Sequence, residues 1–251
     1  MRAALIPPKG YERFALESDI HLVLPMVPMM SNKDYVQTYV TARARGDYII
    51  LDNGAAEQQL VDGERLMNVA RALRPHEIVA PDVLHDAAGT LEATNSFLAE
   101  FPEARDYNIM GVLQGDNLGD RQYLLNQYAK NDSITAIGIP KCLITEDDPD
   151  IRRRDVRRIR KNYPGRFNVH LLGLSSLYPN EIAEFGFGKF VRSMDSAQPF
   201  KVTEAGIFMS ESECDAKRRE DYFSYKKEVD TRLLVHNITV FKQWATGGSP
   251  R

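Results

Sequence analysis

The chain has 251 residues, of which 43% are hydrophobic and 27% charged, a composition of folded globular proteins rather than of disordered or collagen-like chains. The formal net charge of −3 argues against a protein that is basic throughout, so contacts with nucleic-acid phosphates would require a local cluster of cations. No apolar stretch approaches the roughly 20 residues that cross a bilayer, and the first residues do not resemble a signal peptide, so we expect a cytoplasmic protein without membrane contact. Cys142 and Cys214 are too few for a disulfide framework or a Cys-rich zinc site, and we expect free thiols.

Short apolar, β-branched runs alternate along the chain with polar segments of helix length, the pattern of buried parallel strands and surface helices. We expect strands at residues 3–6, 21–27, 48–51, 77–81, 108–113, 134–139, 168–172 and 189–192. Asp62, Asp86 and Asp150 each precede a helical pattern and are expected to cap a helix. These features predict an α/β protein with one domain over residues 1–251, a (β/α)8 TIM barrel closed by a C-terminal helical extension at 212–245. The first strand is the weakest, and seven strands with an irregular entry are the alternative.

Polar residues recur where the expected strands end. In a TIM barrel the loops after the strands meet at one mouth, which is where chemistry takes place. One aspartate after a strand is more often a helix cap or an Asx-turn than a catalytic group. Recurrence at several strand ends, beside glycines that let a flat ligand approach the backbone, favours a carboxylate-based enzyme. The residues concerned are Asp52, Asp82, Gln114, Gly115, Gly138, Gly173 and Asp195.

A strongly basic segment follows the sixth expected strand. Eight cations lie between residues 152 and 166, and only Asp155 opposes them in that window. A helix over this segment would be basic almost all round, which fits a nucleic-acid surface about as well as a solvated helix face. The candidate phosphate contacts are Arg152, Arg153, Arg154, Arg157, Arg158, Arg160 and Lys161.

Several of these strand-end motifs, in the same order along nearly the whole chain, resemble those of the tRNA-guanine transglycosylases. Residues 52–57 are similar to that family's Asp-Ser-Gly-Gly-Phe-Gln, residues 112–115 to its Val-Gln-Gly-Gly, and residues 170–174 to its Tyr-Leu-Met-Gly-Val. Residues 195–199 keep its Asp-x-x-x-Pro spacing, and residues 236–238 resemble its His-Asn-Leu. The family's Cys-x-Cys-x-x-Cys plus His zinc site is absent. The chain therefore most resembles the compact, zinc-free phage enzymes that place 7-deazaguanine bases in DNA.

The resemblance implies that guanine in DNA is replaced by a 7-deazaguanine base, without a metal or cofactor. Asp195 would be the nucleophile that forms a covalent sugar intermediate, and Asp52 would move protons to and from the bases. Asp82 would accept hydrogen bonds from the guanine ring. The other residues expected around the base are Gln114, Gly115, Gly138, Leu172, Gly173, Asn53 and Gly54.

Three alternatives remain open from the sequence. The first is a small tRNA-guanine transglycosylase that acts on tRNA, and the second is a non-catalytic nucleic-acid-binding subunit of such an enzyme. The third is a sugar-phosphate aldolase on the same fold with Lys141 as a Schiff base, because one barrel supports many chemistries.

Overall fold

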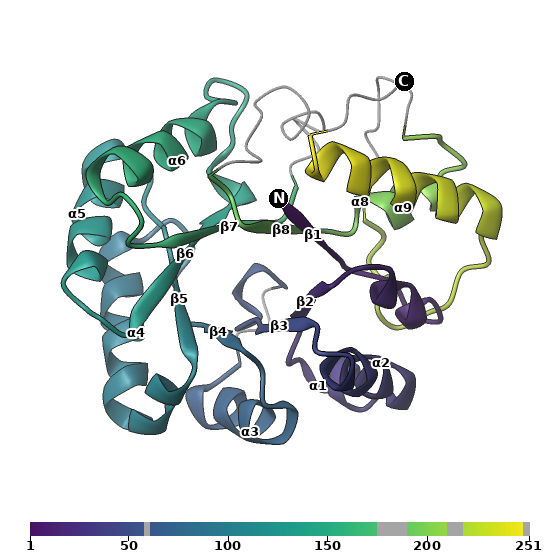
Figure 1. Ribbon diagram of the computed structural model, residues 1–251, viewed down its shortest axis with the longest axis horizontal. Helices are drawn as coiled ribbons and strands as arrows, with labels where there is room; N and C mark the ends of the chain where they lie inside the picture. The colour runs from purple at the N-terminus through teal and green to yellow at the C-terminus, as the bar shows by residue number, and fades with distance from the viewer. Residues whose placement is uncertain (58–60, 175–189, 210–217, 248–251) are drawn as a thin grey trace.

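Eight parallel strands form a ring with helices on its outside (Figure 1). This computed structural model describes residues 1–57, 61–174, 190–209 and 218–247. The strands are β1 (Arg2–Leu5), β2 (Ile20–Val23), β3 (Tyr48–Leu51), β4 (Glu77–Val79), β5 (Asn108–Val112), β6 (Ile134–Pro140), β7 (Asn168–Leu172) and β8 (Ser193–Ser196). Their hydrogen-bonded order is β1-β8-β7-β6-β5-β4-β3-β2. The predicted (β/α)8 barrel is confirmed.

The first strand is real, so the seven-strand alternative is wrong. β1 pairs in parallel with β8, with Ala4 opposite Asp195. On its other side β1 lies beside β2, where side chains bridge the seam: Ser18 Oγ donates to the Ala3 carbonyl oxygen at 2.5 Å, and Arg2 Nη2 donates to the Asp19 carbonyl oxygen at 2.6 Å. These contacts help to hold together the two strands at the ends of the hydrogen-bonded order.

The last strand lies further along the chain than the sequence predicts. Residues 190–192 precede β8, and Lys189 lies outside the described residues. The error has a physical reason. Ser193 and Asp195 put polar side chains into the barrel interior, and such a strand does not look apolar in sequence.

Helices follow most strands and cover the outside of the ring (Figure 1). They are α1 (Val27–Met30), α2 (Lys33–Ala44), α3 (Gly63–Leu73), α4 (Ala87–Glu100), α5 (Leu118–Ala129), α6 (Ile151–Asn162), α8 (Gln198–Glu204) and α9 (Thr231–Ala245). Short 3-10 turns are η1 (Glu12–Glu17), η2 (Ala55–Glu57), η3 (Pro102–Asp106) and η4 (Lys141–Leu143).

Two of the three predicted caps are confirmed. The Asp62 side chain accepts from the Arg65 backbone N–H at 2.7 Å, and the Asp86 side chain accepts from that of Gly89 at 2.9 Å. Asp150 stands at the cap position of α6, but its carboxylate accepts from Arg153 Nη2 at 2.6 Å and from no cap N–H.

The predicted helical extension at 212–245 is only partly helical. Residues 212–217 lie outside the described residues, residues 218–230 form turns and extended chain, and α9 begins at Thr231 behind the Asp230 cap. Arg219 explains the turn, because its guanidinium binds the Glu204 carboxylate at 3.1 Å and the Tyr225 carbonyl oxygen at 2.5 Å. That fixed geometry replaces a helical ladder in this segment.

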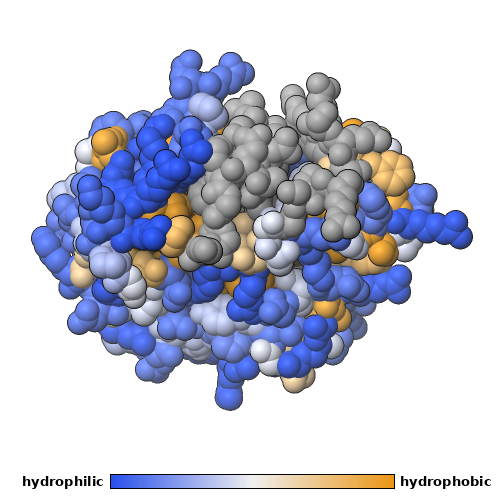
Figure 2. All heavy atoms as spheres, turned by 45° about the horizontal axis from the view of Figure 1, so that its top comes forward, coloured by the Kyte–Doolittle hydropathy of each residue, from blue (hydrophilic) through white to orange (hydrophobic). Residues whose placement is uncertain are grey.

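The surface is mainly hydrophilic on the face shown in Figure 2, where apolar side chains form small separate patches. Within the described ranges, no helix combines the length and the apolar character needed to span a bilayer.

Candidate active site

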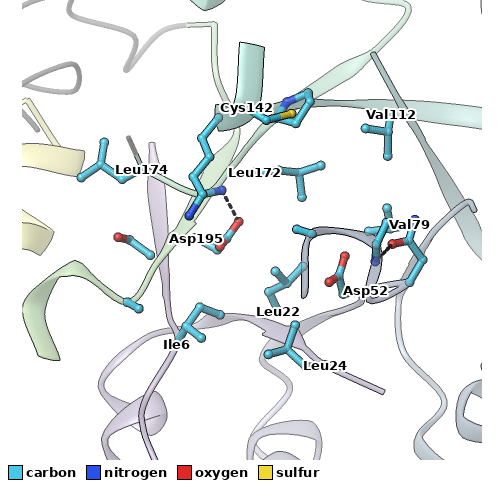
Figure 3. Close-up of a pocket in the computed structure, with 18 of the residues that line it drawn as sticks. Ile6, Leu22, Leu24, Asp52, Val79, Val112, Cys142, Leu172, Leu174 and Asp195 are labelled. Carbon is cyan, nitrogen blue, oxygen red and sulfur yellow. Dashed lines mark hydrogen bonds between the residues drawn. The ribbon is translucent and has the colours of Figure 1, made fainter. Parts of the chain in front are cut away.

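A cavity of about 530 Å³ opens at the C-terminal end of the barrel (Figure 3). Residues from all eight strands or from the loops that follow them contribute to its wall, as expected for a TIM barrel. Its apolar part includes Ile6, Leu22, Leu24, Val79, Val112, Leu172 and Leu174. Its polar part includes Asp52, Asn53, Asp82, Gln114, Lys141, Asp195, Lys201 and Arg218. The cavity therefore combines an apolar wall with three carboxylates and three cations.

Asp52 and Asp195 point into this cavity from facing sides (Figure 3). Asp52 follows β3 and is buried, with 7% of its surface exposed. Burial raises the pKa of the Asp52 carboxyl to about 7, and the charges of Asp195 and Asp82 add to the rise. The backbone N–H groups of Asn53 and Gly54 oppose the rise without cancelling it. Asp52 therefore can hold and release a proton near neutral pH.

One oxygen of Asp195 is in contact with two nitrogen atoms. Its Oδ1 accepts from the Gly173 backbone N–H at 2.9 Å and lies 3.2 Å from Nε2 of His170. The backbone of Gly173 has a φ of +72°, which favours glycine, and this conformation aims its N–H at the carboxylate. A carboxyl that carries a proton near neutral pH, opposite an anchored carboxylate, suits displacement at a glycosidic carbon.

The sequence did not single out His170 for this site, nor the cavity residues Lys201 and Arg218. His170 is fully buried in β7, opposite Ser193 of β8, and its Nδ1 lies 2.8 Å from Ser193 Oγ. The available signal was the alternation along β7, which puts His170 on the same strand face as Leu172, a cavity residue.

Asp82 is held by two side-chain amides. Its Oδ1 accepts from Asn53 Nδ2 at 2.7 Å, and its Oδ2 accepts from Gln114 Nε2 at 2.6 Å. Asn53 Nδ2 also donates to the Ala80 carbonyl oxygen at 2.7 Å, and Gln114 Oε1 accepts from the His85 backbone N–H at 3.1 Å. Burial raises the pKa of Asp82, and the two amides oppose that rise. Asn53 and Gln114 thus fix the orientation of Asp82 as well as line the cavity.

The structure brings Leu172 and Gly173 to the cavity but not the other predicted glycines. A Cβ at Gly138 would lie 2.7 Å from Leu172 Cδ1, and the carbonyl oxygen of Gly138 accepts from the Leu113 N–H, so this residue packs inside the barrel. The carbonyl oxygen of Gly115 accepts a hydrogen bond from Arg121 Nη1 at 3.0 Å, and the residue packs against α5. Gly54 has a φ of +80° and turns the chain after Asp52. The prediction that the backbones of Gly115 and Gly138 address a base is not supported.

The basic helix α6 is amphipathic, not basic all round. Ile151, Val156 and Ile159 are buried on one face. Arg152 shares that face with 0% exposure, and its Nη1 donates to the Gly173 carbonyl oxygen at 2.8 Å, so its assignment as a phosphate contact is wrong.

The other cations of α6 differ in exposure. Arg153 and Arg158 are partly buried and pair with Asp150 and Asp155. The exposed cations of the helix are Arg154, Arg157, Arg160 and Lys161.

No cation of α6 lines the cavity, but three cations from other parts of the chain do. Lys141 begins η4 directly after β6, Lys201 lies in α8, and Arg218 precedes the turn at Asp221–Ser224. Cys142 also lines the cavity, and burial raises the pKa of its thiol. Cys214 lies outside the described residues. Lys141, Lys201 and Arg218 are called the cationic rim below.

Among the described residues, no three His, Cys, Asp or Glu side chains are grouped closely enough to hold a metal ion. No family model matches this chain, and no curated protein matches it.

Proposed function

We propose that this protein is a cytoplasmic enzyme that exchanges a purine base in DNA, replacing guanine by a 7-deazaguanine base through a covalent intermediate on Asp195. One observation carries the proposal: a buried carboxyl with a pKa of about 7, Asp52, faces an anchored carboxylate, Asp195, across one cavity. Retaining glycosidases cleave their substrates with such a pair of carboxyl groups.

The first half of the reaction breaks the bond between guanine and the sugar. An oxygen of Asp195 attacks C1′ as the C1′–N9 bond breaks, and the electron pair of that bond leaves with the base. The protonated Asp52 gives its proton to the departing base, so a neutral guanine and an aspartyl ester of the sugar result. Asp52 is then ionised.

The second half reverses these steps with another base. Asp52 takes the proton from the ring nitrogen of the incoming 7-deazaguanine, that nitrogen attacks C1′, and the C1′–oxygen bond to Asp195 breaks. Asp195 regains its charge and Asp52 its proton, so no oxidant, metal or cofactor is consumed.

Base recognition is assigned to Asp82. With its two oxygens fixed by Asn53 and Gln114, the carboxylate keeps lone pairs that can accept the N1–H and the exocyclic amine of a guanine-type ring. A base without these donors would leave buried acceptors unpaired, which makes such a site selective. The cavity volume of about 530 Å³ lies within the common range for small-molecule sites.

A nucleic-acid substrate fits the charges at the cavity. A free base carries no phosphate, whereas a nucleotide within a strand would bring its phosphates to the cationic rim. The target must be single-stranded or flipped out of a duplex, because the cavity lies inside the barrel mouth. The exposed cations of α6 lie outside the cavity lining and are the alternative location for these contacts.

The decisive experiment measures incorporation of a radiolabelled 7-deazaguanine into single-stranded DNA and into tRNA. We expect label in DNA, and trapping of a covalent DNA adduct that Asp195→Asn abolishes. Asp106→Asn, a change at an exposed carboxylate that does not line the cavity, should leave exchange unchanged. Label in tRNA alone would make the protein a tRNA enzyme. Binding of DNA or tRNA without exchange into either would support a non-catalytic subunit and refute the proposal.

A further inference from the structure

We infer that His170 is a positioning residue: it carries its hydrogen on Nε2, holds Oδ1 of Asp195, and thereby leaves Oδ2 as the oxygen that attacks the sugar. The assignment of the hydrogen rests on the hydrogen bonds alone. The assignment of the attacking oxygen also rests on the proposed function.

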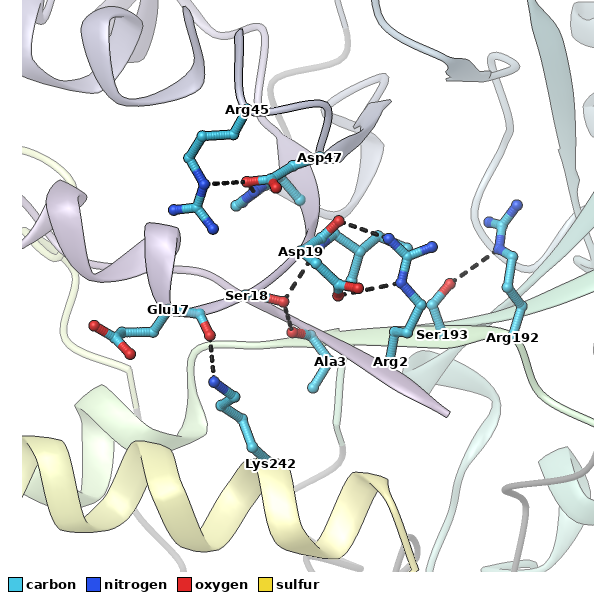
Figure 4. A network of polar contacts seen from close by, with 12 residues as sticks. Arg2, Ala3, Glu17, Ser18, Asp19, Arg45, Asp47, Arg192, Ser193 and Lys242 are labelled. Carbon is cyan, nitrogen blue, oxygen red and sulfur yellow. Dashed lines mark hydrogen bonds and ion pairs between the residues drawn. The ribbon is translucent and has the colours of Figure 1, made fainter. Parts of the chain in front are cut away.

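A continuous chain of polar contacts runs from the cavity down through the barrel. Asp195 Oδ1 lies 3.2 Å from His170 Nε2, and His170 Nδ1 lies 2.8 Å from Ser193 Oγ. Arg192 Nε donates to Ser193 Oγ at 3.2 Å (Figure 4). The Arg192 guanidinium is fixed by Glu77, whose two carboxylate oxygens each accept at 2.7 Å. Each link therefore has a defined neighbour on both sides.

The direction of donation along these hydrogen bonds follows from Arg192. An arginine can only donate, so Ser193 Oγ accepts from it and keeps its own hydrogen to give. Ser193 is buried, and the other contact of its hydroxyl among the described residues is His170 Nδ1. If the hydroxyl donates to Nδ1, that nitrogen is unprotonated and the ring hydrogen lies on Nε2.

The contact between His170 and Asp195 requires the same tautomer. An ionised carboxylate oxygen can only accept, so Nε2 must carry a hydrogen for its 3.2 Å contact with Asp195 to be favourable. A doubly protonated ring would point two donors outward and leave the buried Ser193 hydroxyl without an acceptor, which is unfavourable. The neutral ring with Nε2–H satisfies every group in the chain.

The consequence for Asp195 is that its two oxygens differ. Oδ1 accepts from both Gly173 N and His170 Nε2, whereas within the described part of the chain no hydrogen bond is made to Oδ2. Since Asp195 lines the cavity, the less engaged oxygen is the better nucleophile and forms the bond to C1′ as the bond to the base breaks (Figure 3). His170 and Gly173 prevent the carboxylate from rotating, which preserves the attack geometry.

Nuclear magnetic resonance tests the hydrogen position without any activity. In protein labelled with ¹⁵N-histidine, His170 is identified by the signals lost in His170→Phe. We expect a protonated, pyrrole-type Nε2 and an unprotonated, pyridine-type Nδ1. Protonated nitrogens at both positions, or a hydrogen on Nδ1 alone, would overturn the inference. In Ser193→Ala the contact with Asp195 remains, so the hydrogen should stay on Nε2.

Kinetics of base exchange test the positioning role. His170→Phe should lower kcat by about 10- to 100-fold with KM for DNA within about twofold, because binding groups remain in place. His170→Gln should recover part of that loss, since its amide N–H can replace Nε2–H. An unchanged kcat in His170→Phe would overturn the role.

His21 provides a matched control. It is also fully buried and paired with a carboxylate, Asp47 at 3.0 Å, but it packs against Tyr39 of α2, and Asp47, unlike Asp195, does not line the cavity. His21→Gln should alter stability and leave kcat unchanged. In a crystal structure of the trapped intermediate, a C1′–Oδ1 bond would refute the choice of oxygen. Absence of exchange in the wild-type protein would refute the proposed function while leaving the tautomer testable.

Discussion

Replacing Asp52 by asparagine should make the protein more stable and inactive at the same time. The substitution keeps the shape of the side chain and removes a buried negative charge that faces Asp195 and Asp82. Sites that hold like charges close together for chemistry commonly sacrifice stability in this way. The double outcome separates a functional carboxyl from a structural one.

The magnitude follows from the pKa of Asp52. A carboxyl whose pKa rises from 3.8 to about 7 on folding lowers the free energy of unfolding by about 4 kcal/mol once it is ionised. The folded protein binds this proton more tightly than the unfolded chain does, so the cost is absent below pH 3.8. The destabilisation grows as the pH rises from 3.8 to about 7 and is complete above pH 7. We therefore expect the free energy of unfolding of Asp52→Asn to be higher than that of wild type by up to about 4 kcal/mol at pH 8 and by less at pH 5.

Urea denaturation of both proteins at pH 5 and pH 8 measures the difference. Asp106→Asn serves as the control, because this exposed carboxylate should change stability by less than about 0.5 kcal/mol at either pH. The exchange rate of Asp52→Asn should fall by about 10² to 10⁴, the usual contribution of a general acid. Equal stability of Asp52→Asn and wild type at pH 8, or a difference independent of pH, would refute the reasoning.

Three further outcomes are expected. The rate of guanine release, measured from pH 5.5 to 9, should be constant at low pH and fall above about pH 7 as Asp52 loses its proton. A constant rate up to pH 9 would contradict the role of Asp52 as the acid. Changing Lys141, Lys201 and Arg218 together to glutamine should reduce the slope of log affinity against log salt by about 2 for single-stranded DNA, measured by fluorescence anisotropy. The same change at Arg157, Arg160 and Lys161 of α6 should leave the slope unaltered, and the reverse result would place the phosphate contacts on α6. Gly111→Ala should destabilise the fold by about 1–3 kcal/mol in urea denaturation, because the new Cβ would lie 2.7 Å from the Tyr128 ring. The Tyr128 hydroxyl donates to the Val112 carbonyl oxygen and restrains the ring. A loss under about 0.5 kcal/mol would show that the ring moves freely.

Features that depend on residues close together in the chain could be predicted from the sequence. Alternating apolar runs predicted most of the strands, and Asp62 and Asp86 marked two helix starts by caps that span three residues. Asp52, Asp82 and Gln114 could be expected at the mouth because each directly follows an apolar run that predicts a strand. In the structure all three line the cavity, within three residues of the ends of β3, β4 and β5. The last strand was misplaced, because pairing with distant β1 and β7, not local composition, makes residues 193–196 a strand.

Which polar side chains contact each other depends instead on the packing of the folded chain. Arg152 and Arg157 look alike in sequence, but the packing of α6 through Ile151 and Val156 buries the first and exposes the second. Likewise, His170 contacts Asp195 only because β7 and β8 lie side by side in a register that sets it opposite Ser193. Strand and cap patterns are set by interactions within a few residues, whereas register and helix rotation are set by packing between segments far apart in the chain. Strand and cap patterns can therefore be read from a single sequence, whereas strand register and helix rotation become known only when the chain is folded.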